Sequence, residues 1–368
     1  MSTGSKKKSK RRLKKRKLVL LFVELIVMIF AIVALIIVIK TTNKETGIQN
    51  FALNSEDISV SSEIKQKVQT DEKFQNYTNI AFFGVDARNK KADLSRTTRT
   101  DVIMICSINN TTKDIKLASV YRDTYLNVGN DSYNKCNSAY AKGGYEQAIN
   151  MLNMNLDLYM TDFITVGFQG VISAVDAVGG VDIDVTQAEI SYLNDYQASI
   201  YATEDNPRLI TDYVPVTKPG MQTLNGQQAL AYCRIRAIGN DFQRTERQRA
   251  VLQQIMLKAQ RMTPAQLNQL ATDVFPLIAT SFTFDELVSM VAGVGQYRIA
   301  ETTGFPFDGY YTTGMIGSKG SCVVPTDLNL NVIKLHEFLF PDVEYSPSQD
   351  VVTYSEKIHA DTAPYVGR

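Results

Sequence analysis

The sequence predicts an α/β protein in which a central mixed β-sheet is covered by helices on both faces, preceded by one transmembrane helix. Three observations support this fold class. Apolar segments typical of strands alternate with segments of helical periodicity between residues 79 and 340. These strands are apolar along most of their length, as when both faces of a sheet are buried. A long apolar run, 18–39, precedes them.

The N-terminus has the pattern of a membrane anchor. The first 17 residues contain ten Lys or Arg and no acidic residue, and Glu24 is the only charge in the run from Leu18 to Ile39. As a helix this run would span roughly 30 Å, the thickness of a bilayer core. The basic flank predicts a cytoplasmic N-terminus and an extracytoplasmic remainder, in the cell membrane. Lys40 and Thr41 offer no cleavage site, so we expect an uncleaved anchor.

The remainder divides into three predicted parts. Residues 40–76 are polar, with one weakly amphipathic stretch, and are expected to form a stalk. Residues 77–345 are expected to form the folded domain, and 346–368 a disordered tail. Residues 41–368 hold 28 Lys and Arg against 37 Asp and Glu, so this part is acidic. The basic stub beside a membrane helix indicates lipid contact, and we expect no nucleic-acid partner.

The elements follow from apolar periodicity and from turn signals. The turn between residues 108 and 115 predicts a hairpin, Gly179 and Gly180 end a helix, and Thr283 begins another. Residues 188–218 are expected to be irregular. Strands are predicted at 79–84, 101–108, 115–121, 163–166, 181–185, 301–307 and 322–324. Helices are predicted at 145–156, 168–178, 224–234, 245–262, 264–277, 284–294 and 328–340.

Several kinds of site are disfavoured. The four cysteines have no metal-ligand spacing, so a structural zinc site is not expected. A disulfide between Cys136 and Cys322, which lie in polar loop contexts, is our hypothesis for an extracytoplasmic protein. Only His336 and His359 are present, and His336 lies in an apolar helix, which disfavours Ser-His-Asp or Cys-His catalysis. No phosphate-binding or dinucleotide-binding glycine motif occurs.

Arginines and aspartates gather where the predicted strands end. Asp86 and Arg88 follow the first strand, Arg99 and Asp101 open the second, and Arg122 follows the third. Ligands of open α/β sheets bind where strands end, so these segments are expected to converge.

A second group of arginines follows later in the chain. Arg234 and Arg236 precede a helix on which Arg244 and Gln248 share one face, with Asp241 as its expected cap. A solvated, salt-bridged helix end is the ordinary explanation for such a group. However, arginines recur in four segments of an acidic region, which favours an anion site.

Guanidinium groups suit phosphate oxygens, and several converging ones indicate a multiply charged ligand such as a pyrophosphate. Asp86 and Asp101 offer the carboxylate oxygens that Mg²⁺, or Mn²⁺ in its place, prefers. The sequence therefore indicates phosphoryl transfer, in which a metal stabilises the leaving phosphate.

Seven motifs in order resemble the LytR-CpsA-Psr family: GVDAR, TRTDVIMI, SVYRDT, KCNSAYAKGG, DFITVGFQGVISAVDAVGGVDIDV, GMQTLNGQQALAYCRIR and GNDFQRTERQR. The resemblance covers about residues 79–262 closely. It implies the LytR-CpsA-Psr fold and a transferase that moves a secondary wall polymer, such as a teichoic acid or capsule polysaccharide, from a polyprenyl-pyrophosphate carrier to peptidoglycan.

The resemblance also implies roles for individual residues. Asp86 and Asp101 would bind magnesium. Asp241 would orient or deprotonate the acceptor hydroxyl, while Arg122 and Arg244 would act on the transferred phosphate. The remaining pyrophosphate contacts would be Arg88, Arg99, Lys135, Arg234, Arg236 and Gln248.

The polyprenyl tail requires an apolar slot, for which ordinary core packing is an equal alternative. The candidate residues are Phe168, Val171, Ile172, Val175 and Val178. Two other functions remain open for the same residues: a non-catalytic receptor for the carrier or polymer, and a pyrophosphatase that uses water as the acceptor. Asp86 and Asp101 favour chemistry over binding alone.

Overall fold

The computed structural model describes residues 48–366, apart from 54–55, 57, 90–91, 96–98, 201–209, 211 and 239–240, and apart from the side chain of Asp241. The predicted cytoplasmic stub and membrane anchor, 1–39, lie outside these residues. Within the described part of the chain, no helix is both long and apolar enough to cross a membrane.

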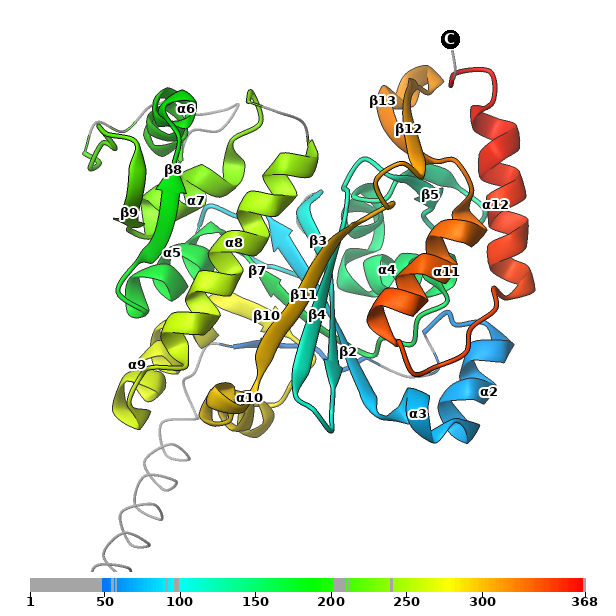
Figure 1. Cartoon of the computed structure of the whole chain (residues 1–368), viewed down its shortest axis with the longest axis horizontal. Coiled ribbons are helices and arrows are strands. Elements are labelled where there is room, and N and C mark those ends of the chain that lie inside the picture. The colour runs from blue at the N-terminus through cyan, green and yellow to red at the C-terminus, as the bar shows by residue number, and fades with distance from the viewer. Residues whose placement is uncertain are drawn as a thin grey trace, which may run out of the picture. The chain divides into compact units, whose positions relative to one another are not determined.

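The described residues contain a mixed seven-stranded sheet, which confirms the α/β class and the central mixed sheet of the prediction (Figure 1). β2, β3 and β4 are antiparallel neighbours, and β7 and β11 run parallel to β2 and β4. The predicted hairpin is formed by β3 and β4. Across the sheet the strands are β1 (Gln49–Asn50), β10 (Ile278–Thr280), β7 (Asp162–Val166), β2 (Tyr77–Val85), β3 (Thr100–Asn109), β4 (Asp114–Val120) and β11 (Arg298–Phe305).

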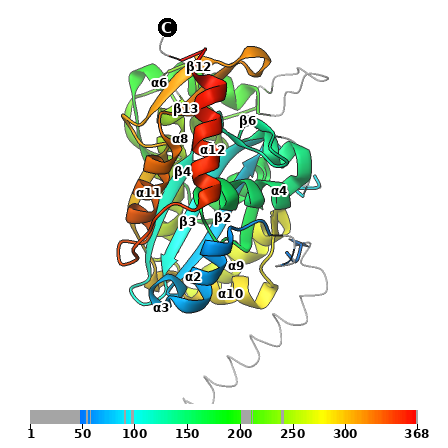
Figure 2. The ribbon, with the colours of Figure 1, turned by 90° about the vertical axis from the view of Figure 1, so that its right-hand side faces the viewer.

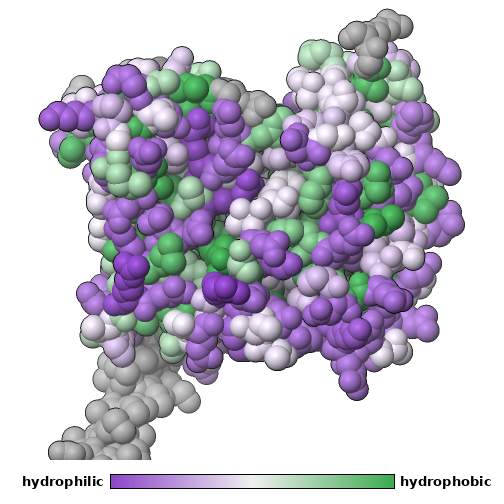
Figure 3. All heavy atoms as spheres, viewed as in Figure 1, coloured by the Kyte–Doolittle hydropathy of each residue, from purple (hydrophilic) through white to green (hydrophobic). Residues whose placement is uncertain are grey.

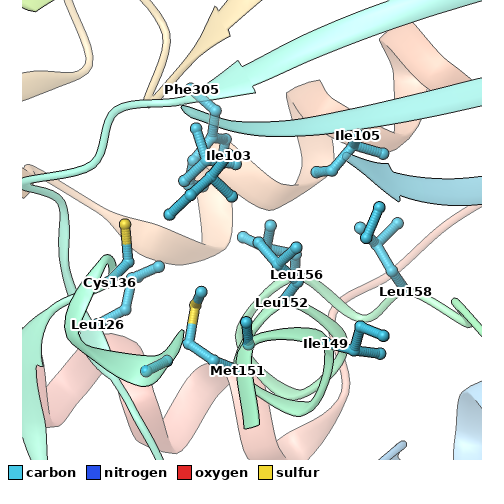
Figure 4. Close-up of a cluster of buried hydrophobic side chains, with 14 of the residues drawn as sticks. Ile103, Ile105, Leu126, Cys136, Ile149, Met151, Leu152, Leu156, Leu158 and Phe305 are labelled. Atoms are coloured by element: carbon cyan, nitrogen blue, oxygen red, sulfur yellow. The ribbon is translucent and has the colours of Figure 1, made fainter. Parts of the chain in front are cut away.

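Side chains of the central strands alternate between two apolar layers. Ile103 and Ile105 belong to one layer, whereas Met104 and Cys106 belong to the other. This alternation explains why the strands are apolar throughout, because successive side chains point to opposite faces and both faces are covered. Figure 4 shows Ile103 and Ile105 above Leu152 in the first layer.

Helices cover both faces of the sheet, as predicted. One face carries α4 (Ser138–Leu156), α11 (Leu328–Leu339) and α12 (Gln349–Thr362), with α12 outermost in Figure 2. The other face carries α8 (Asp241–Ala259), α9 (Pro264–Val274) and α10 (Phe284–Ala292). The capping box predicted at Thr283 is present.

A separate apolar layer joins helices to a two-stranded antiparallel sheet, and Val251 of α8 also packs in it. Its elements are α5 (Phe168–Ala177), β8 (Val181–Val185), α6 (Gln187–Ala198), β9 (Gly220–Leu224) and α7 (Gly226–Arg234). The prediction that 188–218 is irregular is therefore wrong for its first part. The side chain of Glu189 accepts from Thr186, and this capping box begins α6 despite its polar surface.

The predicted stalk and tail are both corrected. From residue 48 onward the described part of the supposed stalk belongs to the domain, because β1 joins the sheet. Ile64 of α2 (Ser62–Thr70) and Phe74 of α3 (Glu72–Gln75) are also buried. The supposed disordered tail contains α12, whose residues Val351 and Ile358 are buried. Their seven-residue spacing places both on one helix face, which packs against the domain.

The hypothesised disulfide between Cys136 and Cys322 is absent, since both cysteines are present as thiols. Each thiol instead contacts backbone carbonyl groups, Cys136 those of Tyr121 and Arg122 and Cys322 that of Gly320. These cysteines lie near two small hairpins, formed by β5 (Tyr125–Asn127) with β6 (Tyr133–Lys135) and by β12 (Tyr311–Met315) with β13 (Ser321–Pro325).

Candidate pyrophosphate-binding site

The ends of three neighbouring strands meet at one edge of the sheet. β2 ends at Val85, which pairs with Thr100 at the start of antiparallel β3, and β4 ends at the same edge. Asp86, Asp101 and Arg122 are therefore brought together, as expected from their positions at the ends of predicted strands. The C-terminal end of parallel β7 lies beside β2 and leads into α5 at Phe168.

Asp101 is the centre of the charged cluster. Its Oδ1 accepts from Nη1 of Arg122 at 2.5 Å, and both its carboxylate oxygens accept from Nη2 of Arg236, at 3.0 and 3.1 Å. Its backbone carbonyl accepts from Nη2 of Arg244 at 3.1 Å. Burial alone would raise the pKa of Asp101, but the charges of Arg236, Arg122 and Arg244 outweigh it and lower the pKa below its ordinary value. Asp101 is therefore ionised at neutral pH.

A second group surrounds the ring of Phe168. Arg88 donates to both carboxylate oxygens of Asp86, at 2.7 and 3.0 Å, and this pairing raises the pKa of Arg88. The guanidinium carbons of Arg88 and Arg234 lie 5.6 and 4.8 Å from the centre of the Phe168 ring. Burial lowers the pKa of Arg234, which the Asp86 carboxylate opposes. Stacking on an aromatic ring holds a guanidinium in place without neutralising it.

A cavity of about 380 Å³ adjoins both groups. Asp86, Arg88, Asp101, Arg234 and Arg236 contribute to its polar wall, together with Arg244 and Gln248 of α8. The rest is mainly apolar and is contributed by the sheet, by α5 and α7, and by α8. These lining residues are Phe82, Phe83, Val85, Val102, Met104, Val166, Phe168, Val171, Leu230, Val251, Leu252 and Ile255. The cavity thus joins a wall rich in arginines and carboxylates to an apolar slot.

Only part of the predicted apolar slot lines this cavity. Phe168 and Val171 do, but Ile172, Val175 and Val178 do not. Val175 is fully buried in the layer that joins α5 to the β8–β9 sheet. A helix turns about 100° per residue, so one face of α5 meets the cavity while the other packs inward. Strand residues such as Met104 were missed because the sequence identified them only as core.

Three other predicted site residues have different positions. Arg99 is exposed and does not line the cavity. Lys135 pairs with Asp123 at 3.1 Å, and Asp123 lies 3.7 Å from Nε of Arg122, so Lys135 borders the cluster. α8 begins at Asp241, but the side chain of Asp241 lies outside the described residues.

The molecular surface is hollowed near these elements. In the view of Figure 3 the hollow lies at the top, between the part that contains α6, α7 and α8 and the part that contains the β12–β13 hairpin. Ring contacts connect the two parts, because Phe242 in α8 lies 4.3 Å from Tyr121 and 4.6 Å from Tyr311, centre to centre. Tyr121 immediately precedes Arg122, so these contacts tie α8 to the charged cluster.

The model of the LytR_cpsA_psr family matches residues 40–318 of this chain. The chain belongs to the LytR_cpsA_psr family. Its relatives include biofilm regulatory protein A of Streptococcus mutans, 27% identical over 188 residues, which are 49% of this chain and 43% of that protein. The polyisoprenyl-teichoic acid–peptidoglycan teichoic acid transferase TagV of Bacillus subtilis is 29% identical over 47% of this chain and 41% of its own. These family matches span less than half of either relative.

Solved structures of similar proteins share the fold. A Streptococcus agalactiae protein superposes with a TM-score of 0.61 and 21% identity, covering 82% of this chain and 98% of its own. Bacillus subtilis TagT with bound octaprenyl pyrophosphate lipid superposes with a TM-score of 0.52 and 16% identity, covering 85% of this chain and 100% of its own. At this identity within the family, the likeness establishes the architecture alone.

Proposed function

We propose that the chain transfers a secondary cell-wall glycopolymer from a polyprenyl-pyrophosphate carrier to peptidoglycan and forms a phosphodiester link. One observation carries the proposal: Asp86 and Asp101 lie among arginines at the wall of a mainly apolar cavity. The arginines suit the pyrophosphate, and the apolar wall suits the prenyl chain. The names of the family relatives, which include teichoic acid transferases, agree with this reading.

Magnesium is part of the proposal. Asp86 and Asp101 fit Mg²⁺ by donor type, since both carboxylates line one cavity and the lowered pKa keeps Asp101 ionised. In the described part of the chain no three His, Cys, Asp or Glu side chains are grouped to hold a metal. Water and phosphate oxygens would therefore complete the coordination. When bound, Mg²⁺ would stabilise the negative charge of the leaving phosphate.

The proposed reaction is a phosphoryl transfer. The acceptor hydroxyl forms a bond to the phosphorus nearest the glycan, and the bond from that phosphorus to the bridging oxygen breaks. Polyprenyl phosphate leaves, and the hydroxyl proton passes to a base, for which Asp241 remains the candidate from the sequence. Three arginines place positive charge where negative charge develops on the phosphates: Arg122, Arg236 and Arg244.

The proposal includes the location of the reaction. Residues 1–17 would remain in the cytoplasm, 18–39 would span the cell membrane, and the catalytic domain would lie outside, where carrier and peptidoglycan meet. The sequence pattern supports this topology.

The test uses the full-length chain in detergent with a polyprenyl-pyrophosphate-linked oligosaccharide, peptidoglycan fragments and MgCl₂. Release of polyprenyl phosphate together with a glycan–peptidoglycan phosphodiester is expected for the wild type and for Arg298→Ala, a variant of the distant ion pair with Asp114. Both products should be lost in Arg122→Ala. Polyprenyl phosphate without the conjugate would identify a pyrophosphatase, and carrier binding without turnover would identify a receptor.

A further inference from the structure

α6 lies outside the segments in which the sequence indicated an anion site, yet it contacts the arginine segment at two points. The first is a buried ion pair. Nε of Arg247 donates to Oε1 of Glu189 at 2.8 Å, and each side chain is only 8% exposed. The other carboxylate oxygen of Glu189 caps the first turn of α6. Glu189 therefore fixes Arg247 relative to the start of this helix.

Arg247 in turn holds the backbone on both sides of Arg236. Its Nη1 donates to the carbonyl of Ile235 at 3.2 Å, and its Nη2 donates to the carbonyl of Ile238 at 3.3 Å. Arg247 does not line the cavity, whereas Arg236 does. Planar guanidinium geometry lets one side chain join the carboxylate and both carbonyls at once. The course of the chain through Arg236 thus depends on the Glu189–Arg247 pair.

The second contact is made by Tyr196, seven residues after Glu189 and thus on the same face of α6. The Tyr196 carbonyl accepts from Nη1 of Arg234 at 3.4 Å. Its ring centre lies 5.2 Å from the guanidinium carbon of Arg234, which also packs on Phe168. Tyr196 lines the cavity beside Arg234. One helix face therefore positions both arginines, Arg236 through Arg247 and Arg234 directly.

We infer that α6 is a positioning helix for the diphosphate group, with Glu189 and Tyr196 as its positioning residues. This inference rests on the proposed function, because the pyrophosphate of the carrier is the ligand that the two arginines would bind. The Glu189 carboxylate orients Arg236 through Arg247, and the ring and carbonyl of Tyr196 orient Arg234. The preference of the site for a diphosphate over an uncharged prenyl alcohol then depends on α6, while the apolar wall serves both ligands.

The test measures equilibrium binding of polyprenyl pyrophosphate and of polyprenol to the full-length chain in detergent. Glu189→Gln and Tyr196→Leu should each weaken diphosphate binding roughly tenfold or more, as misplaced contacts do, and leave polyprenol binding within about twofold. Tyr196→Phe retains the ring and the carbonyl and should bind like the wild type. Asp182→Asn, which alters a more exposed ion pair with Lys258, is the matched acid-to-amide control.

The outcomes separate the inference from the proposed function. If the wild-type protein does not bind polyprenyl pyrophosphate more tightly than polyprenol, both the proposed function and this inference are wrong. A wild-type preference that persists in both variants, or equal loss of both ligands, would overturn the inference alone and leave α6 as a scaffold. If Glu189→Gln does not fold, the comparison of Tyr196→Leu with Tyr196→Phe still tests whether α6 positions the arginines for the diphosphate.

Discussion

Arg236 donates through one nitrogen to both carboxylate oxygens of Asp101, although 135 positions separate the two residues in the chain. Arg122 shares the same carboxylate at 2.5 Å. Two guanidinium groups therefore surround the Asp101 carboxylate, which is also a proposed ligand of Mg²⁺. When the anionic ligand and Mg²⁺ bind, the arginines can pair with the phosphates while the Asp101 carboxylate pairs with Mg²⁺. No charge is then left unpaired.

Asp101→Asn should separate binding from turnover. Loss of the carboxylate should reduce Mg²⁺-dependent transfer by about 100-fold. Binding of polyprenyl pyrophosphate without Mg²⁺ should become tighter, because Arg122 and Arg236 lose their anionic partner. Parallel turnover and metal-free binding assays check both effects. Asp114→Asn, which alters the ion pair with Arg298, should change neither. Unchanged turnover in Asp101→Asn would remove Asp101 from the proposed metal site.

Leu252→Trp should distinguish the two parts of the cavity. Leu252 lines the apolar part from α8, so a larger side chain should exclude a long prenyl chain. Affinity for a long-chain polyprenyl pyrophosphate should fall about tenfold or more, a change of roughly 1.4 kcal/mol. Affinity for inorganic pyrophosphate should not change. Leu257→Trp is the control on the same helix, because Leu257 is exposed and does not line the cavity. Equal effects of both variants on both ligands would contradict the apolar slot.

His336→Phe should flatten the pH dependence of stability. Burial lowers the pKa of His336 from 6.5 to about 3, and its Nε2 lies 2.9 Å from the Leu156 carbonyl. Between pH 6.5 and about pH 3 the His336 imidazole is protonated in the unfolded chain and neutral in the folded chain. His336 thus contributes stability that is complete above pH 6.5 and is lost as pH falls, by about 1.4 kcal/mol per pH unit.

Denaturant titrations between pH 4 and 8 compare the slopes of the variants. The free energy of unfolding of His336→Phe should depend on pH less steeply than that of the wild type, even if the variant is less stable at neutral pH. His359→Gln should keep the wild-type slope, because His359 is exposed. A wild-type slope in His336→Phe would show that other groups cause the pH dependence.

Ile358→Ala should show that the C-terminal helix belongs to the folded domain. Ile358 in α12 is 1% exposed and packs in the layer that contains Val351 and Leu335. Truncation of a buried isoleucine to alanine costs about 2–5 kcal/mol of unfolding free energy. Denaturant unfolding measures the loss, and Glu356→Ala, at an exposed position of the same helix, should have little effect. A disordered tail would make the two substitutions equivalent.

The elements that could be predicted are those with strong periodicity. β2, β3, β4 and α10 were predicted close to their observed bounds because continuous apolar strands and a capping box are local signals. α6 and α12 were missed because many of their buried positions hold polar residues, such as Gln197 in α6 and Ser355 in α12, so the apolar periodicity is weak. Phe168 and Val171 were identified in the cavity, whereas Val175 was assigned to it wrongly, since apolar character does not tell which face of a helix meets a cavity.

The sequence by itself determined the α/β class, the family motifs and the set of arginines and aspartates, because these depend on residue type and on spacing along the chain. Only the tertiary structure decided which arginine meets which carboxylate. Arg236 pairs with Asp101 while Arg247 pairs with Glu189, although both arginines belong to neighbouring parts of the chain. The reason is that α6, α8 and the sheet edge come together only on folding, so the order of residues in the chain does not show which carboxylate lies within reach of each guanidinium.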